Sequence, residues 1–233
     1  MNSVILSQQL LLAIKTNTSS ELFIQELERK PARILYEELM NENRRKIYWI
    51  NLYNAFVQWL IQKQTPDFSN RLNRINFFSG RKINLSGTLL SLNDIEHGML
   101  RNSSIWWSMG YLQKMMPSNF EKQLRVPLDY RIHFALNCGA FSCPAISFYS
   151  PDESDQQLNN AMKTFLDQEV ILNNDRSSAK VSSIFKWYRG DFGGQAGIIQ
   201  LISNHYGINR NQLRKLIFKP YDWNISPGNF SVL

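Results

Sequence analysis

The sequence is poor in the side chains that build disulfide frameworks and metal sites. Its 233 residues include two cysteines, Cys138 and Cys143, and three histidines. One pair of cysteines is too few for a disulfide-dense scaffold or for a zinc ribbon, which needs four ligands at paired spacings. We therefore expect neither a metal ion nor a cofactor. With so few thiols and imidazoles, each one can be considered individually as a functional group.

Long hydrophobic segments are also missing. No uninterrupted apolar run approaches the roughly 20 residues that span a bilayer, so no transmembrane helix is expected. The chain starts with MNSVILSQQLLLAI, in which no basic residue precedes the apolar stretch and Gln8 and Gln9 interrupt it. An intact signal peptide is therefore not expected. The default expectation is a cytoplasmic protein, or an exported one if a signal peptide has been removed.

Charged residues are scarce for a chain of this length. They make up 19% of the sequence, against 43% hydrophobic and 12% aromatic residues, which excludes a disordered tail and favours a folded core. The net charge of +7 permits an anionic partner. The basic residues are spread along the chain, apart from one local cluster of Arg71, Arg74, Arg81 and Lys82. Because there is no nucleic-acid-binding motif and no basic stripe, nucleic acid is not the expected partner.

One domain is expected over residues 1–233, because no internal repeat and no Pro/Gly/Ser-rich linker divides the chain. Its N-terminal part, about 1–63, has the pattern of helices. Residues 42–62 carry apolar side chains at steps of three and four on most sides, which predicts a long central helix. Asn51 and Asn54 fall within it. Buried amides need partners, so these two either satisfy polar groups inside the helical layer or hold a loop backbone or a catalytic side chain.

A short strand and a capped helix are predicted after this helical part. Residues 82–85 favour a strand that is followed by a Ser-Gly turn. Ser91 and Asp94 fit a capping box that opens a helix reaching Arg101. On an α-helix, Glu96 belongs to the core-facing side, Arg101 lies on the opposite side, and His97 lies at the border between them.

The remainder of the chain mixes strand and helix patterns. Residues 130–137 alternate between two faces and predict a strand that ends at the Cys-Gly-Ala turn of 138–140. The other predicted elements are a strand or strand end at 180–185 and helices at 154–168, 195–204 and 211–218. Together these patterns predict an α+β fold in which a helical layer packs on a small, mostly antiparallel sheet.

The turn after the predicted strand carries the densest set of reactive residues. Cys138 is well placed there to be exposed at a sheet end, and Gly139 allows close backbone approach, so that amides nearby can stabilise an oxyanion. A cysteine needs a base or a positive neighbour to become a thiolate. His133 and His97 are the candidate bases. His205 sits at a predicted helix C-terminus, where a cationic side chain has an ordinary role against the helix dipole.

Other roles stay open for the same residues. Cys138 could be a small core residue and His133 a hydrogen-bonded sheet residue. Cys138 and Cys143 could form a local disulfide if the turn brings their Cα atoms within about 7 Å. Both cysteines could bind a metal together with a histidine, although their spacing is not that of a recognised zinc site. Glu96 and His97 could line one pocket wall or could simply satisfy local polar groups.

Several segments, in order along the chain, resemble known motifs. They are YWINLYNA at 48–55, LSLNDIEHGMLR at 90–101, RIHFALNCGA at 131–140 with SCP at 142–144, IFKWYRGDFG at 184–193 and PYDWN at 220–224. These blocks are similar to those of the domain-of-unknown-function family number 547, whose members occur in bacteria and in plants. Asp191, inside the fourth block, is predicted from its position after an aromatic helix end to be a structural cap.

The resemblance implies one site that contains Asn54, Glu96, His97, His133 and Cys138. A relation to papain-like or transglutaminase-like cysteine hydrolases is compatible with these motifs. In the usual papain order the cysteine precedes the histidine, so a base at position 97 or 133 implies a permuted order.

From these residues we predict a cysteine-dependent hydrolase or an acyl-transferase-like enzyme acting on a small molecule or a peptide. Cys138 is the predicted nucleophile, with a depressed pKa and a faster reaction with thiol probes than Cys143. His133 or His97 is the predicted base, and Glu96 orients the imidazole. The predicted supporting residues are Asn54, Asn137, Asn51 and Arg101. The alternative is a non-enzymatic interaction or envelope-associated module that keeps a polar pocket for structural reasons.

Overall fold

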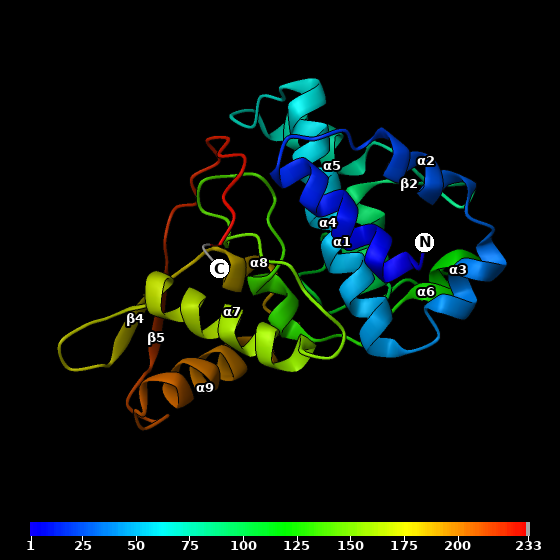
Figure 1. Cartoon of the computed structure of the whole chain (residues 1–233). Helices are drawn as coiled ribbons and strands as arrows, with labels where there is room; N and C mark the ends of the chain where they lie inside the picture. The colour runs from blue at the N-terminus through cyan, green and yellow to red at the C-terminus, as the bar shows by residue number, and fades with distance from the viewer. Residues whose placement is uncertain (232–233) are drawn as a thin grey trace.

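The computed structural model of the chain describes residues 1–231 (Figure 1). Its α-helices are α1 (Ser3–Lys15), α2 (Glu21–Arg29), α3 (Ala32–Glu38), α4 (Glu42–Gln64), α5 (Arg71–Ser79), α6 (Asn119–Leu124), α7 (Ser154–Glu169), α8 (Ile184–Trp187) and α9 (Gly194–Tyr206). A π-helix, η1 (Asp94–Leu100), and a 3₁₀-helix, η2 (Tyr130–Phe134), complete the helices. The strands are β1 (Ile83–Leu85), β2 (Thr88–Leu90), β3 (Ile171–Leu172), β4 (Ser178–Val181) and β5 (Lys215–Phe218). This content confirms the predicted α+β class.

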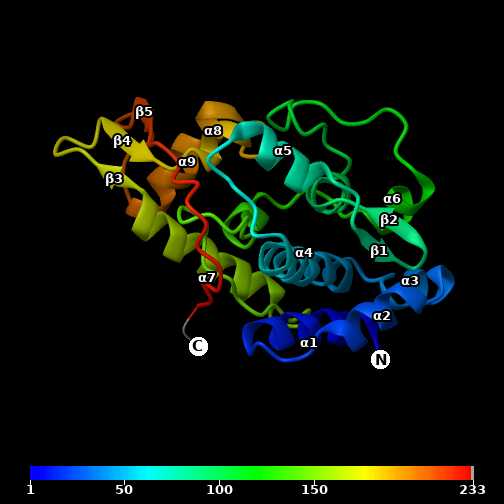
Figure 2. The same cartoon turned by 90° about the horizontal axis from the view of Figure 1, so that it is seen from above.

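The N-terminal part of the chain is built around α4. Helix α1 packs along α4, and the two run side by side in both views (Figures 1 and 2). The α4 side chains are buried without interruption from Lys46 to Gln58, as expected for a central helix covered on all sides. Asn41 caps the helix start by accepting from the Arg44 amide at 3.1 Å. The predicted central helix is therefore confirmed.

Two asparagines on α4 bind the backbone of the segment that carries the cysteines. Asn51 donates to the carbonyl of Tyr149 at 3.0 Å and accepts from its amide at 3.2 Å. Asn54 donates to the Ala135 carbonyl and accepts from the Asn137 amide, both at 2.9 Å. Both asparagine side chains are fully buried. The two amides therefore hold a loop backbone against the helix, which was one of the two roles expected for them.

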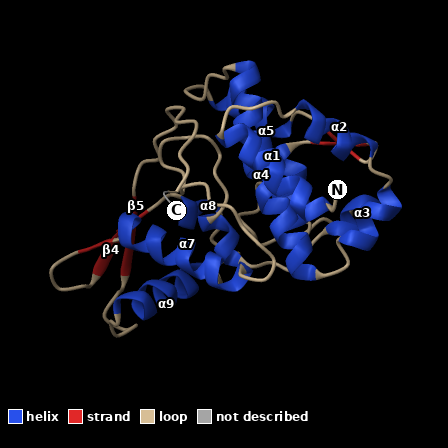
Figure 3. Ribbon diagram, in the orientation of Figure 1, coloured by secondary structure: helices blue, strands red, loops and turns tan. Residues whose placement is uncertain are grey.

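The strands form two small sheets (Figure 3). β1 and β2 make an antiparallel hairpin in which Leu85 pairs with Thr88. Ser86 and Gly87 both have positive φ, which matches a two-residue turn of the kind that hairpins prefer. The second sheet has the order β3-β4-β5, with β3 antiparallel and β5 parallel to β4. The predicted strand at 82–85 and its turn are confirmed.

Two hydrophobic clusters fill the interior of the described chain. The first surrounds α4 and includes residues of α1, β1 and η1. The second lies among α7, α8, α9 and the sheet β3-β4-β5. The 3₁₀-helix η2 joins them, because Ile132 belongs to the first cluster and Phe134 to the second. No helix within residues 1–231 has the length and hydrophobicity to cross a membrane.

Two predicted elements are wrong. Residues 130–137 form η2 and a loop instead of a strand, because no strand within residues 1–231 pairs with them and Asp129 caps a helical turn by accepting from the Arg131 amide at 3.1 Å. Residues 132–137 are all buried, and Ile132 and Phe134 enter different clusters, so the alternation does not mark two faces of a sheet. Residues 211–218 end in strand β5 instead of a helix, because this segment pairs with β4 from Ser178↔Lys215 to Val181↔Phe218. Tertiary pairing overrides the local preference there.

Candidate functional site

The π-helix η1 and the residue that follows it place the side chains of Glu96, His97 and Arg101 on one side. Ser91 and Asp94 form the predicted capping box: Asp94 accepts from the Ser91 amide at 2.9 Å, and the Ser91 hydroxyl accepts from the Asp94 amide at 3.0 Å. The helix then widens, because the Arg101 amide bonds to the Glu96 carbonyl, five residues back, at 3.0 Å. This wider turn brings Arg101 back to the side of Glu96 and His97. The expectation that Arg101 lies opposite Glu96 is therefore wrong.

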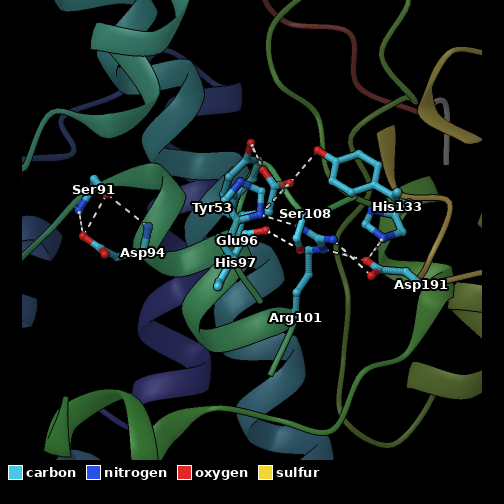
Figure 4. Close-up of polar contacts among 11 residues, drawn as sticks. Tyr53, Ser91, Asp94, Glu96, His97, Arg101, Ser108, His133 and Asp191 are labelled. Carbon is cyan, nitrogen blue, oxygen red and sulfur yellow. Dashed lines mark hydrogen bonds and ion pairs between the residues drawn. The ribbon is translucent and has the colours of Figure 1, made fainter. Parts of the chain in front are cut away.

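Asp191 is the centre of a buried polar network (Figure 4). It accepts from Arg101 twice, from Nε at 2.6 Å and from Nη2 at 3.0 Å, and it contacts His133 Nε2 at 2.7 Å. The Arg101 and Asp191 side chains are fully buried. Burial alone raises the pKa of Asp191, but the bonds from His133 and Arg101 outweigh it and hold this pKa below its usual value. Asp191 is therefore an ionised carboxylate shared by a cation and an imidazole.

Glu96 is held by two tyrosines. Tyr53 donates its hydroxyl to Oε2 at 2.9 Å, and Tyr188 donates to Oε1 at 2.6 Å. Burial favours the protonated acid, yet the charge of the His97 ring when it is protonated, the Tyr188 hydroxyl and the Arg101 guanidinium together lower the pKa of Glu96. The site thus contains a second buried carboxylate. Figure 4 shows Glu96 between Tyr53 and the Arg101 side chain.

His97 is a neutral imidazole. Its Nδ1 lies 2.7 Å from Arg101 Nη1, and because a guanidinium only donates, Nδ1 accepts this bond. Burial is the main cause that lowers the pKa of His97 to about 4. The 3.6 Å approach of Nδ1 to Glu96 is therefore not an ion pair at neutral pH. A ring whose Nδ1 lone pair already binds Arg101 is poorly placed to accept a proton there.

His133 has a different arrangement. Its ring stacks on Tyr188 with centroids 3.9 Å apart, and burial, only partly offset by Asp191, lowers the pKa of the imidazole. A neutral His133 donates Nε2–H to Asp191. Within residues 1–231, the Nδ1 atom of His133 makes no hydrogen bond, so it carries an uncommitted lone pair. Of the two imidazoles in this network, His133 is thus the one with a free basic nitrogen.

Cys138 and Cys143 are neighbouring free thiols beside Tyr221. The Tyr221 hydroxyl lies 3.4 Å from the Cys138 sulfur and 3.2 Å from the Cys143 sulfur. The Cys143 sulfur also accepts from the Cys138 amide at 3.0 Å. Cys143 is buried, whereas Cys138 is partly exposed. The two cysteines are therefore within reach of each other but are not bonded in this structure.

The two thiols have opposite pKa shifts. The neighbouring Cys143 thiol, followed by burial, raises the pKa of Cys138. Burial also acts on Cys143, but hydrogen bonds from Cys138, Tyr221 and the Ala140 backbone outweigh it and lower the pKa of Cys143. The expectation that Cys138 has the depressed pKa is therefore wrong. The amide donors of the turn converge on the Cys143 sulfur, so this sulfur is the one that they stabilise as a thiolate.

The turn that follows Cys138 is held tightly against α4. Asn137 accepts from the Gly139 amide at 2.8 Å and donates to the Pro144 carbonyl at 2.7 Å. Gly139 has φ +85°, a conformation that strains any other residue, and a Cβ atom there would also displace the end of the Ile61 side chain. The amides of Cys138 and Gly139 are both occupied within the turn. They are therefore not free to stabilise an oxyanion, contrary to the expectation from sequence.

Neither thiol forms a hydrogen bond with an imidazole among the described residues. Cys138 nevertheless lies close to the network. Burial and the Glu96 carboxylate raise the pKa of Tyr53 and Tyr188, and a charge on the Cys138 sulfur would raise the pKa of both tyrosines further.

The third histidine is remote from the network: His205 is near the end of α9 and contacts the exposed Asp167 at 2.6 Å. Within residues 1–231, no three His, Cys, Asp or Glu side chains are arranged to hold a metal ion.

Sequence reasoning missed four residues of this region, namely Tyr53, Tyr188, Asp191 and Tyr221. Asp191 has a role different from the predicted cap, because its partner Arg101 is 90 residues away. The motif blocks are the sequence feature that could have identified these four residues. The four residues all lie inside segments that resemble family motifs, whereas only histidine, cysteine and acidic residues near them were considered as reactive groups.

The sequence model of a family described as "Protein of unknown function, DUF547" matches residues 37–166. The chain belongs to the DUF547 family. The matched region includes α4, η1 and both cysteines, and Tyr188, Asp191 and Tyr221 lie beyond it. No curated protein and no solved structure matches the chain. Membership in DUF547 confirms the resemblance found in the motif blocks and assigns no activity to the site.

Proposed function

We propose that this DUF547 protein is a cysteine-dependent hydrolase or acyl transferase, with Cys138 as the nucleophile and His133 as the proton-transfer residue. The observation that carries the proposal is the His133–Asp191 contact of 2.7 Å, which leaves Nδ1 of a neutral imidazole unbonded. A base oriented by a carboxylate, with its second nitrogen free, is the arrangement that nucleophilic catalysis requires. Asp191 takes the orienting role that Glu96 was expected to have.

Cys138 is the favoured nucleophile because it is the less buried of the two cysteine residues. The pair shares its protons, so that movement of one proton from Cys138 to the Cys143 sulfur leaves a thiolate at the accessible position. Tyr221, whose hydroxyl contacts both sulfurs, is placed to donate to the oxygen of a substrate carbonyl held there. This is the role that the occupied turn amides do not fill.

In the proposed reaction the Cys138 thiolate attacks the carbonyl carbon of an ester, amide or thioester. A carbon–sulfur bond forms, the bond to the leaving group breaks, and the leaving group takes a proton from the thiol pair through His133. Water, or another acceptor in an acyl transfer, then attacks the thioester carbon while His133 Nδ1 accepts its proton. The carbon–sulfur bond breaks, the acyl group leaves on the acceptor, and the proton passes from His133 back to the thiol pair. In this reaction the substrate bridges the sulfur and the imidazole, so the two groups need no direct hydrogen bond with each other.

Acylation by p-nitrophenyl acetate tests the proposal. Intact-mass and peptide analysis of acid-quenched samples should find an acetyl group on Cys138, formed faster than on the same thiols of the urea-unfolded protein. Cys138→Ala should lose the adduct and Cys143→Ala should keep it. His133→Gln should slow its formation by on the order of 10²–10⁴-fold. His205→Gln is the matched control, since His205 lies outside the network, and it should react at the wild-type rate.

A second candidate function is a non-enzymatic module that keeps the polar network for structural reasons. The observation that favours it is the completeness of the network: Arg101 and Asp191 are fully buried and satisfy each other with two bonds. In that case Cys138 reacts no faster in the folded protein than in the unfolded one, and His133→Gln lowers stability without changing acylation. That pair of results would overturn the hydrolase proposal.

A further inference from the structure

A segment of unusual composition joins η1 to α6. Residues 105–116, called here the apolar loop, expose seven large apolar side chains: Trp106, Trp107, Met109, Tyr111, Leu112, Met115 and Met116. Met115 is 97% exposed and Trp107 is 60% exposed, values typical of side chains that the fold leaves uncovered. Figure 2 shows the bright green segment that leads to α6 running along the outer edge of the molecule. Soluble proteins rarely leave so many apolar side chains together in water without a use for them.

The base of the apolar loop is firmly held. Within it the Ile105 amide donates to the Leu112 carbonyl at 2.9 Å, and at its end the Lys114 amide donates to the Ser103 carbonyl at 2.7 Å. The tip is fixed to the segment of the Asp191 network, because the Gly190 amide donates to the Met109 carbonyl at 2.7 Å. The apolar side chains are therefore presented on an ordered backbone.

Gly110 explains how the tip approaches so closely. Its φ is +93°, and a Cβ atom at this position would lie 2.0 Å from the Asp191 carboxylate. Only glycine allows this contact. The exposed aromatic residues thus belong to a loop whose backbone touches the buried network.

The charges around the apolar loop are cationic. The loop itself contains one charged residue, Lys114, which pairs with Glu121 at 3.1 Å. Arg125 binds the Ser103 hydroxyl at the base of the loop, and Arg189 precedes the glycine that holds the tip. Among the described residues, neither arginine forms an ion pair with a carboxylate, and Lys122 on α6 has none either. The apolar loop and the residues that contact or follow it therefore carry a surplus of positive charge, although the Arg189 guanidinium itself lies over the Phe218 ring.

We propose that the apolar loop docks the protein on the surface of a lipid bilayer that contains anionic headgroups. Tryptophan and tyrosine favour the boundary between headgroups and acyl chains, where an apolar ring and a polar tip are both accommodated. Basic residues beside them are attracted to anionic lipid. The net charge of +7 acts in the same direction. The mode is peripheral, since insertion of a loop tip needs no spanning helix.

Binding to vesicles tests this proposal independently of the Cys138 chemistry. The full-length protein is floated with vesicles of phosphatidylcholine alone or with a third of phosphatidylglycerol. We expect binding to the anionic vesicles, weakened by added salt because the attraction is screened. Quenching of tryptophan fluorescence by brominated lipid should accompany binding. The Trp106→Ser/Trp107→Ser variant should bind the vesicles at least about ten-fold more weakly, since burial of each ring in the bilayer strengthens binding by on the order of ten-fold.

The matched control is Leu22→Ser/Met40→Ser, which removes two similarly exposed apolar side chains far from the loop in sequence. It should bind vesicles like the wild type, and both double variants should keep the wild-type urea midpoint. Equal binding by the wild type and the tryptophan variant would overturn the proposal, as would binding that is equal for neutral and anionic vesicles. A self-associating wild type that becomes monomeric on Trp106→Ser/Trp107→Ser, without vesicle binding, would instead show that the loop contacts a second copy.

Discussion

Replacing Asn54 by leucine should destabilise the protein, although it adds apolar volume to an apolar helix. The buried Asn54 amide satisfies the Ala135 carbonyl and the Asn137 amide, each at 2.9 Å, and leucine leaves both without a partner. An orphaned buried polar group costs about 1–3 kcal/mol, so two cost roughly 2–6 kcal/mol. The added apolar burial offsets roughly 1–2 kcal/mol. We therefore expect a net loss centred on about 3 kcal/mol in the free energy of unfolding.

Urea denaturation followed by circular dichroism measures this loss as a lower midpoint with an unchanged slope. Asn43→Leu is the matched control, because Asn43 is an exposed residue of the same helix and its replacement should change stability by less than about 0.5 kcal/mol. Asn51→Leu should resemble Asn54→Leu, since Asn51 binds both backbone groups of Tyr149. An Asn54→Leu midpoint equal to or above that of the wild type would refute the reasoning, because it would mean that these backbone groups find other partners.

Three further predictions concern the site. The folded-state pKa of His97 is about 4, below the usual value of about 6.5, so the unfolded chain takes up a proton that the folded chain does not. The free energy of unfolding should therefore fall as the pH decreases from 6.5 to 4, by on the order of 2 kcal/mol between pH 7 and 5. Urea titrations at each pH should show a weaker pH dependence for His97→Gln. Arg101→Leu and Asp191→Leu should each cost about 3–5 kcal/mol, because each leaves a buried charge unpaired; the double variant should be less destabilised than the sum, and simple additivity in this mutant cycle would contradict the pairing. Cys143→Ala should slow alkylation of Cys138 by iodoacetamide at pH 7, because the variant lacks the sulfur proposed to accept the Cys138 proton. An unchanged or faster reaction would oppose the proposed coupling of the two thiols.

The long elements were predictable because each has a complete local pattern. Residues 42–62 and 154–168 repeat apolar side chains at helical spacing and correspond to α4 and α7. The hairpin and the capping box of Ser91 and Asp94 were also predictable, since their chemistry lies within a few residues. Segments 130–137 and 211–218 were mispredicted because their conformation depends on packing between two clusters and on pairing with β4, which no local pattern contains.

The sequence predicted which residues belong to the candidate site better than it predicted which of them contact one another. Glu96, His97, Arg101 and His133 do gather in one buried network, and Asn137 organises the turn next to Cys138. The assignment of partners depended on tertiary distance. Asp191 binds Arg101 across 90 residues and His133 across 58, so position after a helix end could not reveal this role.

The π-helix ties the geometry of this network to the length of the chain. In η1 the hydrogen bond from the Arg101 amide reaches back five residues to the Glu96 carbonyl, one residue further than in an α-helix. Deletion of one residue between 97 and 100 would leave these two positions four apart, the spacing that an ordinary α-helix places on one face, so the guanidinium would stay on the side of Glu96 without the wide turn. The capping box would survive, since it lies before the deletion. A descendant of this chain could therefore lose the wide turn through the deletion of one codon while keeping every polar residue of the site on the same side, and an aligned sequence would record that change only as a one-residue gap.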